Sequence, residues 1–242
     1  MERAVYDRMS ELEATDWWFV ARRGLIAALI AHRLPRRADA RILEAGCGSG
    51  GNLAMLGRFG TVDAFEYDAL ARAQARQKSL VDVQFGALPS DLPFDGRTYD
   101  LIGLFDVLEH VEADTATLAA LSGRLADRGA ILVTVPAFPF LWSRHDERHQ
   151  HYRRYTRASL TAVAEKAGLR VSHAGYFNFF LFPAAVAARG LKRLTGSETP
   201  DDRMPGPLMN RVLTRVFSFE RHLVGRMRLP FGLSLAAVLE KA

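Results

Sequence analysis

A short apolar run followed by closely spaced glycines constrains this chain more than any other feature. Residues 41–45 read as a strand, and glycines stand at positions 46, 48, 50 and 51, before Asn52. Glycine accepts positive φ angles and has no side chain, so a ligand can lie directly against such a turn. The helix expected near Asn52 would point its free N–H groups at that ligand. The pattern therefore predicts a strand, a ligand-binding loop and a helix.

Two carboxylates indicate which ligand would suit the loop. Glu44 precedes the first glycine, where it would repel a pyrophosphate but accept hydrogen bonds from an ammonium or hydroxyl group. Glu66 ends the next expected strand, about 20 residues further on, where nucleotide-binding βαβ units place their ribose ligand. The loop thus suits a cationic, sugar-bearing nucleoside. A bare G-x-G-x-x-G match ending at Gly51 makes a Rossmann dehydrogenase the nearest competitor.

Further motifs follow the glycine loop in a characteristic order. They are Glu44–Gly50, Phe65–Asp68, Asp91–Phe94, Tyr99–Ile102, Asp106–His110 and Gly129–Pro136. Over about residues 40–175 this ordered set resembles the class I S-adenosylmethionine-dependent methyltransferases of types 11, 12 and 23. The resemblance implies an α/β, Rossmann-like fold. Its mostly parallel sheet would carry helices on both faces, with an N-terminal helical lid and a C-terminal helical insertion.

The resemblance also implies a cofactor and its contacts. S-adenosylmethionine would bind, and S-adenosylhomocysteine would leave as a product. Leu88 stands where many relatives carry an acidic residue for the adenine amine, so a backbone contact is expected there. The expected cofactor-binding residues are Glu44, Gly46, Cys47, Gly48, Gly50, Asn52, Glu66, Tyr67, Leu88, Phe105 and Asp106.

The 242 residues suffice for one α/β domain with insertions. We expect a helical cap over 1–36, a cofactor-binding core over 37–176, a helical insertion over 177–232 and a possible last strand over 233–242. Strand patterns within the core alternate with helical ones at 53–58, 70–78 and 115–127, which predicts a parallel sheet. Beyond the core, we expect an apolar helix or hairpin over 177–194, bent at Pro183, and a helical stripe that includes Met209, Val212, Leu223 and Met227.

Composition narrows the setting. The single cysteine, Cys47, excludes an intrachain disulfide and favours a reducing, cytoplasmic compartment. No signal-peptide pattern or Cys/His metal cluster is visible, and the longest apolar run, Tyr176–Ala188, is too short to span a bilayer. The net charge of +5 equals the excess of nine Lys/Arg over four Asp/Glu within 189–228. That excess indicates either peripheral contact with the inner membrane face or a solvated basic surface.

Candidate chemistry gathers in the long connection over residues 136–155. Histidine is the side chain best suited to accept a proton near neutral pH. The candidates are His145, His149 and His151, with His110 added from the turn after the fourth strand. Arginines there suit a carboxylate or phosphate, although Arg153 could instead pair with an acid such as Asp146. The expected acceptor-binding residues are Trp17, Trp18, Arg22, Trp142, Arg153, Arg154 and Tyr155.

The predicted function is methyl transfer to oxygen or nitrogen of a small molecule, a glycan precursor or a lipid. A nucleic-acid methyltransferase is one alternative, which the pI of about 9.6 allows. No Asn-Pro-Pro-Tyr motif follows the fourth strand and no RNA-binding appendage is visible, so a nucleic-acid partner is not expected. A non-catalytic module that binds S-adenosylmethionine is the other alternative. The sequence leaves the oligomeric state open.

Overall fold

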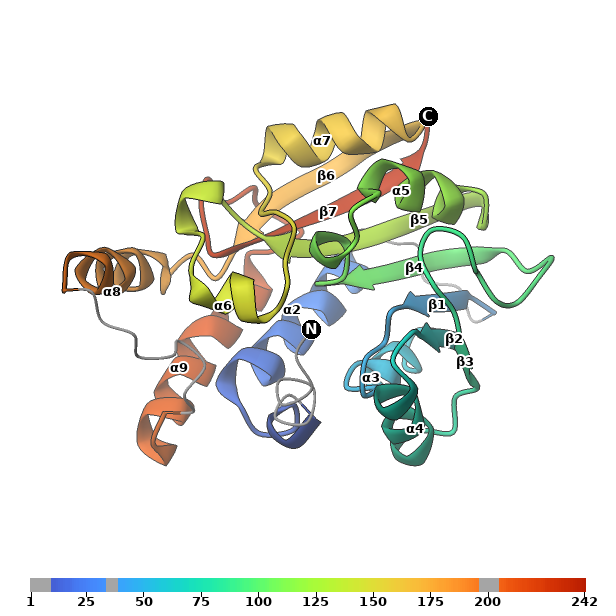
Figure 1. The fold of residues 1–242 in the computed structure, drawn as a ribbon. Helices are drawn as coiled ribbons and strands as arrows, with labels where there is room; N and C mark the ends of the chain where they lie inside the picture. Colours follow the sequence, from blue (N-terminus) through green and yellow to red (C-terminus); the bar gives the residue numbers. More distant parts are fainter. Residues whose placement is uncertain (1–9, 34–38, 196–204) are drawn as a thin grey trace.

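The computed structural model describes residues 10–33, 39–195 and 205–242. Its centre is a seven-stranded sheet in the order β3-β2-β1-β4-β5-β7-β6, with β7 as the antiparallel strand between β5 and β6 (Figure 1). The strands are β1 (Arg41–Ala45), β2 (Thr61–Glu66), β3 (Val83–Phe85), β4 (Tyr99–Phe105), β5 (Leu125–Pro136), β6 (Leu169–Phe177) and β7 (Ser234–Lys241). This arrangement confirms the predicted Rossmann-like, mostly parallel α/β fold.

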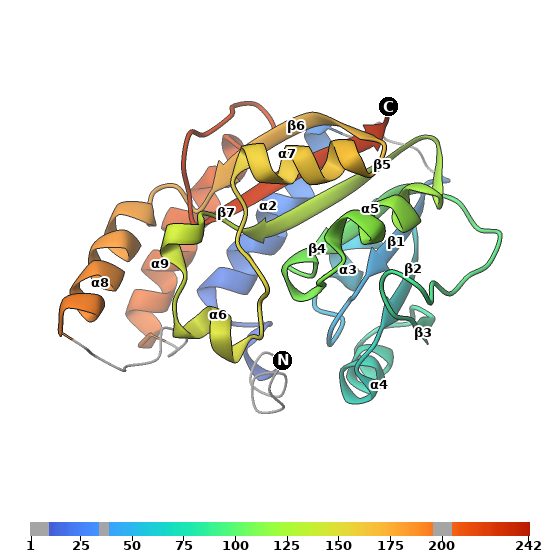
Figure 2. The same ribbon diagram turned by 45° about the horizontal axis from the view of Figure 1, so that its top comes forward.

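Helices cover both faces of the sheet (Figures 1 and 2). The helices on one face are α5 (Asp114–Ser122) and α7 (Arg157–Lys166); those on the other are α2 (Trp17–Arg33), α3 (Leu53–Leu56), α4 (Ala69–Lys78) and α9 (Pro207–Phe219). Strand β4 shows why two layers form. Ile102 and Leu104 join the core under α5 and α7, whereas Leu101 and Phe105 join the core under α2, because successive side chains on a strand point to opposite faces.

Capping residues set several helix boundaries. The Asp68 side chain accepts hydrogen bonds from the N–H groups of Leu70 and Ala71 at the start of α4. Thr156 caps α7 in the same way, accepting from Ser159. The predicted helix over 115–127 is too long: α5 ends before Gly123, and β5 already begins at Leu125. The predicted helix over 53–58 likewise shortens to α3.

The C-terminal part differs from the prediction in two places. Helix α8 (Phe182–Thr195) begins one residue before Pro183, so this proline lies in the first turn and bends nothing. The predicted stripe is also wrong, because Met209 and Val212 are exposed and Leu223 and Met227 lie beyond α9. After α9 come the short turn η3 (Glu220–His222) and the predicted last strand, which is present as β7.

Helix α2 is held against α9 at its first turn. The Trp17 N–H donates to the Asn210 side chain over 2.9 Å, and the Asn210 amide donates to the Thr15 carbonyl over 2.9 Å. The Trp17 ring meets the Phe217 ring edge-on at 5.8 Å. Trp17 therefore packs between helices, and its predicted place in an acceptor wall is not observed. The remainder of the predicted cap, residues 1–9 and 34–36, lies outside the described residues.

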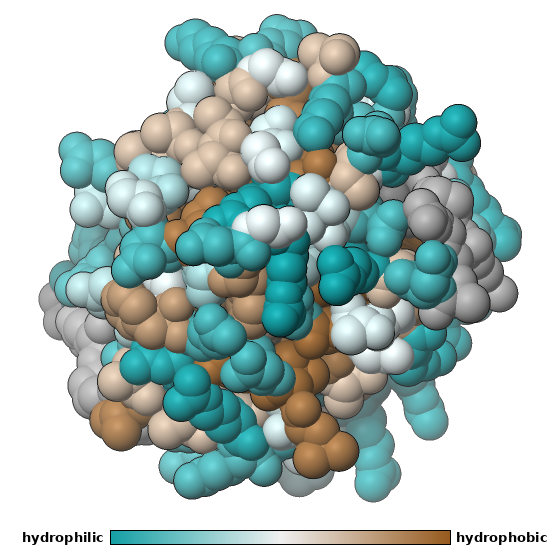
Figure 3. Space-filling view, turned by 90° about the vertical axis from the view of Figure 1, so that its right-hand side faces the viewer, coloured by the Kyte–Doolittle hydropathy of each residue, from teal (hydrophilic) through white to brown (hydrophobic). Residues whose placement is uncertain are grey.

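The molecular surface at the β3 edge of the sheet is mixed. Figure 3 shows hydrophilic residues spread among small hydrophobic areas on this face. The edge strand itself has only three residues, and short edge strands limit unwanted pairing with other chains. Within the described ranges, no helix combines the length and the hydropathy needed to cross a membrane.

Candidate functional site

A cavity of about 460 Å³ lies at the carboxyl ends of β1, β2 and β4. Its volume is in the range of small-molecule sites, and parallel sheets bind ligands at this end. Glu13, which precedes α2, and residues on one side of α2 also line the cavity. The wall further includes Trp18, Arg22, Glu44, Gly46, Cys47, Gly48, Asn52, Glu66, Tyr67, Gly86, Leu88, Phe105, Asp106, Val107 and His110.

The glycine loop forms the floor of the cavity. Gly46 has a φ of +74°, and a Cβ atom there would lie 2.9 Å from the Val107 side chain. The N–H groups of Gly46 and Cys47 both donate to the Phe65 carbonyl, each over 3.0 Å, which ties the loop to β2. Only glycine accepts this conformation and this approach without strain, so the loop backbone stays open to a ligand.

Two carboxylates face the loop from neighbouring strands. Glu44 is buried; its Oε1 accepts from the Asn52 amide over 2.7 Å, and its Oε2 has no partner. Burial raises the Glu44 pKa to about 7, although Asn52 and Arg22 act in the opposite direction. Glu66 accepts from the N–H groups of Gly48 and Asp68, each over 2.8 Å, and burial raises its pKa as well. A cation in this cavity would offset these costs.

S-adenosylmethionine fits this donor and acceptor set. The orphaned Glu44 oxygen can accept from the amino group of the cofactor, and Glu66 lies at the strand end where ribose hydroxyls are held. The carboxylates of Glu44 and Glu66 can together balance the cofactor's positive charge.

The pKa of Glu44 gives a pH prediction. Because the folded-state pKa exceeds the ordinary glutamate value of 4.5, this group's contribution to stability is present below pH 4.5 and is lost as pH rises through about 7. Ionised Glu44 is the form that pairs with the cofactor's ammonium group, whose own pKa lies near 8. We expect the Kd of S-adenosylmethionine to tighten roughly five- to tenfold between pH 6 and pH 7.5. Calorimetry should show a flat profile for Glu44→Gln; a flat wild-type profile would contradict the assignment.

Helix α2 closes one side of the cavity through an ion pair. The Arg22 guanidinium is buried, contacts the Asp106 carboxylate and lies 4.9 Å from the Trp18 ring centre. Asp106 has a φ of +54° and accepts from the Thr134 hydroxyl over 3.0 Å. Arg22 and Trp18 thus form part of the wall, next to Asp106.

Four histidines from two distant segments gather beside the cavity. His110 follows β4 in the short turn η1 (Leu108–His110), and the others lie in or after α6 (Arg144–Arg148). The ring centres are 4.6 Å apart for His110 and His151, and 4.0 Å apart for His145 and His149. Burial is the main cause that lowers the pKa of His110 to about 3, of His145 to about 4 and of His149 to about 2. These three rings are therefore neutral at neutral pH.

A buried carboxylate orients His151. Asp146 is fully buried, and its Oδ1 lies 2.9 Å from His151 Nδ1 and 2.8 Å from Arg154 Nε. Burial alone would raise the Asp146 pKa, but the hydrogen bonds from His151 and Arg154 outweigh it and hold that pKa well below its usual range. An ionised carboxylate only accepts, so Nδ1 carries the proton and a neutral His151 has its lone pair on Nε2.

Several predicted acceptor-binding residues have structural partners instead. Arg154 pairs with Asp146 and donates to the Ala137 carbonyl, and Arg153 pairs with Asp114 over 2.6 Å. The buried Tyr155 hydroxyl also donates to Asp114, over 3.0 Å. Trp142 lies outside the cavity wall. The two arginines therefore hold the loop in place. For Arg153 this agrees with the alternative of an ion pair, but its partner is Asp114 and not Asp146.

Ten of the eleven predicted cofactor residues line the cavity. Gly50 does not: a Cβ there would meet Ala75 and Leu53 at 3.1 Å, so its role is close packing of α4. Glu13 also lines the cavity, but the sequence analysis does not predict it. Its carboxylate accepts from the Ser49 hydroxyl over 2.8 Å and pairs with Lys78 over 2.6 Å. No local motif marks such a contact across distant segments.

Comparisons with known proteins agree with this architecture. A family model described as a methyltransferase domain matches residues 19–174. No curated protein sequence matches the chain. Solved structures show the same fold at low sequence identity.

The plantazolicin methyltransferase BamL, in complex with a triazolic desmethylPZN analog and S-adenosylhomocysteine, has 15% identity and a TM-score of 0.64 over 100% of this chain and 91% of its own. A Haloferax volcanii protein in complex with the Trm112 methyltransferase activator has 19% identity and a TM-score of 0.63, over 98% and 94%. The O-methyltransferase NcsB1, with S-adenosylmethionine and 2-hydroxy-5-methyl naphthoic acid, has 16% identity and a TM-score of 0.58, over 98% and 57%.

Proposed function

Because the chain belongs to the methyltransferase-domain family and is an S-adenosylmethionine-dependent methyltransferase, we propose that it methylates an oxygen or nitrogen of a small molecule bound beside His110. One observation carries the proposal. His110 lines the same cavity as Glu44 and Glu66, and the Asp146-oriented His151 packs against it. Glu44, Glu66 and His110 thus share one cavity, and His151 lies beside His110. The NcsB1 complex with an aromatic hydroxy acid supports a small-molecule acceptor.

The residues of the chain would position the two reactants. Glu66 would hold the ribose and Glu44 the amino group, and the wall made by Arg22 and Trp18 would close the cavity around them. When bound, the cofactor would supply an electrophilic methyl group to the acceptor's lone pair, and the electron pair of the broken sulfur–carbon bond would stay on sulfur. The acceptor must also lose a proton, and we propose that the His110–His151 pair assists this loss.

Glu66→Ala is expected to weaken S-adenosylmethionine binding by about 1–3 kcal/mol. The variant removes the ribose acceptor and also frees the N–H of Gly48, which Glu66 holds at 2.8 Å. Calorimetry of wild type and variant measures the difference in Kd. Asp82→Ala is the matched control, because Asp82 is an exposed carboxylate outside the cavity wall. An unchanged Kd in Glu66→Ala would count against the ribose assignment.

Methyl transfer itself can be tested without knowing the acceptor. Radiolabelled S-adenosylmethionine and purified protein are incubated with small-molecule, lipid, glycan-precursor and RNA fractions of a cell extract. We expect label in the small-molecule fraction, and only in reactions that contain the wild-type protein. Label in lipid or RNA would assign the acceptor elsewhere. Binding of the cofactor with no transfer to any fraction would favour a non-catalytic binding module.

A further inference from the structure

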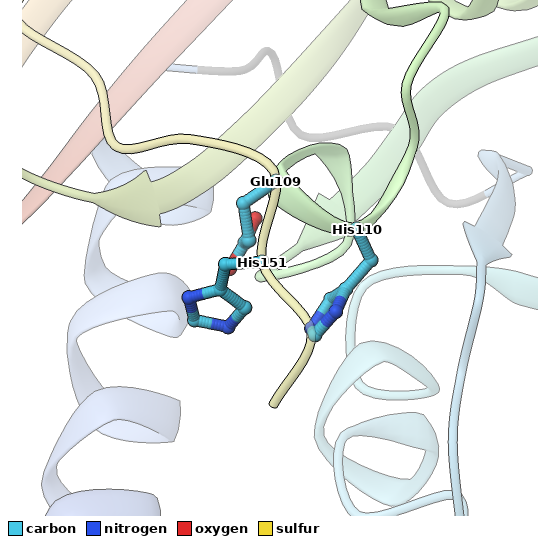
Figure 4. Close-up of side chains that lie close together, drawn as sticks. All are labelled: Glu109, His110 and His151. Carbon is cyan, nitrogen blue, oxygen red and sulfur yellow. The ribbon is translucent and has the colours of Figure 1, made fainter. Parts of the chain in front are cut away.

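Three potential metal ligands converge next to the proposed acceptor position. Glu109 and His110 project from the turn η1 after β4, and His151 comes from the loop that passes beside it (Figure 4). One ligand atom from each lies within 4.8 Å of the other two. We propose that Glu109, His110 and His151 form a binding site for one divalent transition-metal ion of the zinc type. The sequence predicts no metal site, because no Cys/His metal cluster is visible in it.

The first support is an unsatisfied carboxylate oxygen. Glu109 is 1% exposed, and its Oε2 has no hydrogen-bond partner. Buried polar atoms are nearly always paired, and a lone buried carboxylate oxygen is costly. A cation bound to this oxygen would supply the missing partner and the compensating charge.

The second support is the orientation of His151. Its Nδ1 donates to the Asp146 carboxylate over 2.9 Å, and Asp146 is held in turn by Arg154 and by the Ser143 N–H. Metal-binding histidines almost always donate their second ring N–H to such a carboxylate or to a carbonyl, which fixes the ring and increases its basicity. The lone pair on Nε2 is thereby left for an ion. The hydrogen bond between His151 and Asp146 does not involve Glu109, so this support is independent of the first.

The ligand types indicate the class of ion. Two imidazoles and one carboxylate form the three-residue set of catalytic zinc sites and of several iron sites, in which a further position stays open. Ligand atoms around a tetrahedral zinc stand about 3.3 Å apart, so the three side chains must rotate slightly to close on the ion. His110 lines the cavity, so an ion bound to it would lie beside the proposed acceptor position.

A metal ion at this site would also take part in the proposed methyl transfer, and this catalytic role rests on the proposed function. An acceptor hydroxyl bound in the open position would lose its proton to solvent at a lower pH, because a bound metal ion stabilises the alkoxide or phenolate. The oxygen lone pair then forms the bond to the methyl carbon, and the sulfur–carbon pair stays on sulfur as before. In this arrangement, His151 holds the ion and does not itself receive the proton.

The test measures zinc binding without acceptor or cofactor. Chelator-treated, dialysed protein is titrated with Zn²⁺ by calorimetry, and with Co²⁺ to follow its visible absorption. We expect one equivalent of metal ion to bind, and we expect bound Co²⁺ to show the d–d absorption typical of a low coordination number. Glu109→Gln and His151→Asn should each weaken binding at least tenfold. His222→Ala is the matched control, because His222 lies on η3 and is exposed.

The two variants keep the test decisive. Retained S-adenosylmethionine affinity and melting temperature show that a variant is folded; if Glu109→Gln fails this check, His151→Asn decides. Absence of stoichiometric Zn²⁺ binding, or equal binding by wild type and both folded variants, would overturn the site while leaving methyl transfer untouched. Conversely, a protein that binds one Zn²⁺ but labels no acceptor fraction would retain the site and refute the proposed function.

Discussion

Replacing His151 by alanine is expected to lower the rate of methyl transfer about 100- to 10,000-fold while the Kd of S-adenosylmethionine stays unchanged. The separation of the two effects follows from the geometry. His151 packs on His110 at 4.6 Å and is oriented by Asp146, whereas the cofactor carboxylates lie on β1 and β2. The loss is expected whether His151 accepts the proton or holds an ion, because both roles use its Nε2 lone pair.

The measurement compares kcat at saturating cofactor with the calorimetric Kd. His151→Gln serves as a second variant, since glutamine retains a polar side chain but provides no imidazole. His222→Ala reports the effect of removing an unrelated histidine. Normal turnover in His151→Ala would remove this residue from the chemistry, and an equal loss of cofactor affinity would show that it acts by maintaining the cavity.

The cofactor side could be predicted from the sequence because its parts are local. Glycines at fixed places between a strand and a helix, and a carboxylate at the end of the next strand, follow from backbone geometry that repeats in parallel sheets. Gly46 shows the limit of such reasoning. Its positive φ is expected for a tight turn, but its contact with Val107, which follows β4, depends on how strands pair.

The acceptor side could not be predicted to the same depth because its parts are distant. Histidines within residues 145–151 are visible as a cluster, yet their meeting with His110 requires β4 and the 136–155 connection to lie side by side. Arginines showed the opposite problem. Arg153 and Arg154 look like ligand clamps in the sequence, but each has a buried acid to pair with after folding. Charge type alone does not distinguish these outcomes.

Asp146→Ala is expected to destabilise the protein by about 3–5 kcal/mol, the usual cost of leaving one member of a buried ion pair alone. Asp146 is fully buried, and the Arg154 side chain is only 4% exposed. The Arg154 charge therefore stays out of water when Asp146 is removed. Asp146 also accepts from His151 and from the Ser143 N–H, and the variant orphans those donors too. Urea unfolding, followed by far-UV circular dichroism, measures the change.

The matched experiment removes both charges together. Asp146→Leu combined with Arg154→Met leaves no unpaired ion, and buried pairs replaced by apolar residues of similar size are often close to neutral in stability. The double variant should therefore be more stable than Asp146→Ala, although the freed His151 ring should still cost turnover. A destabilisation below about 1 kcal/mol in Asp146→Ala would mean that water reaches Arg154. The loop holding His151 would then be fixed by other contacts, such as the ion pair between Arg153 and Asp114.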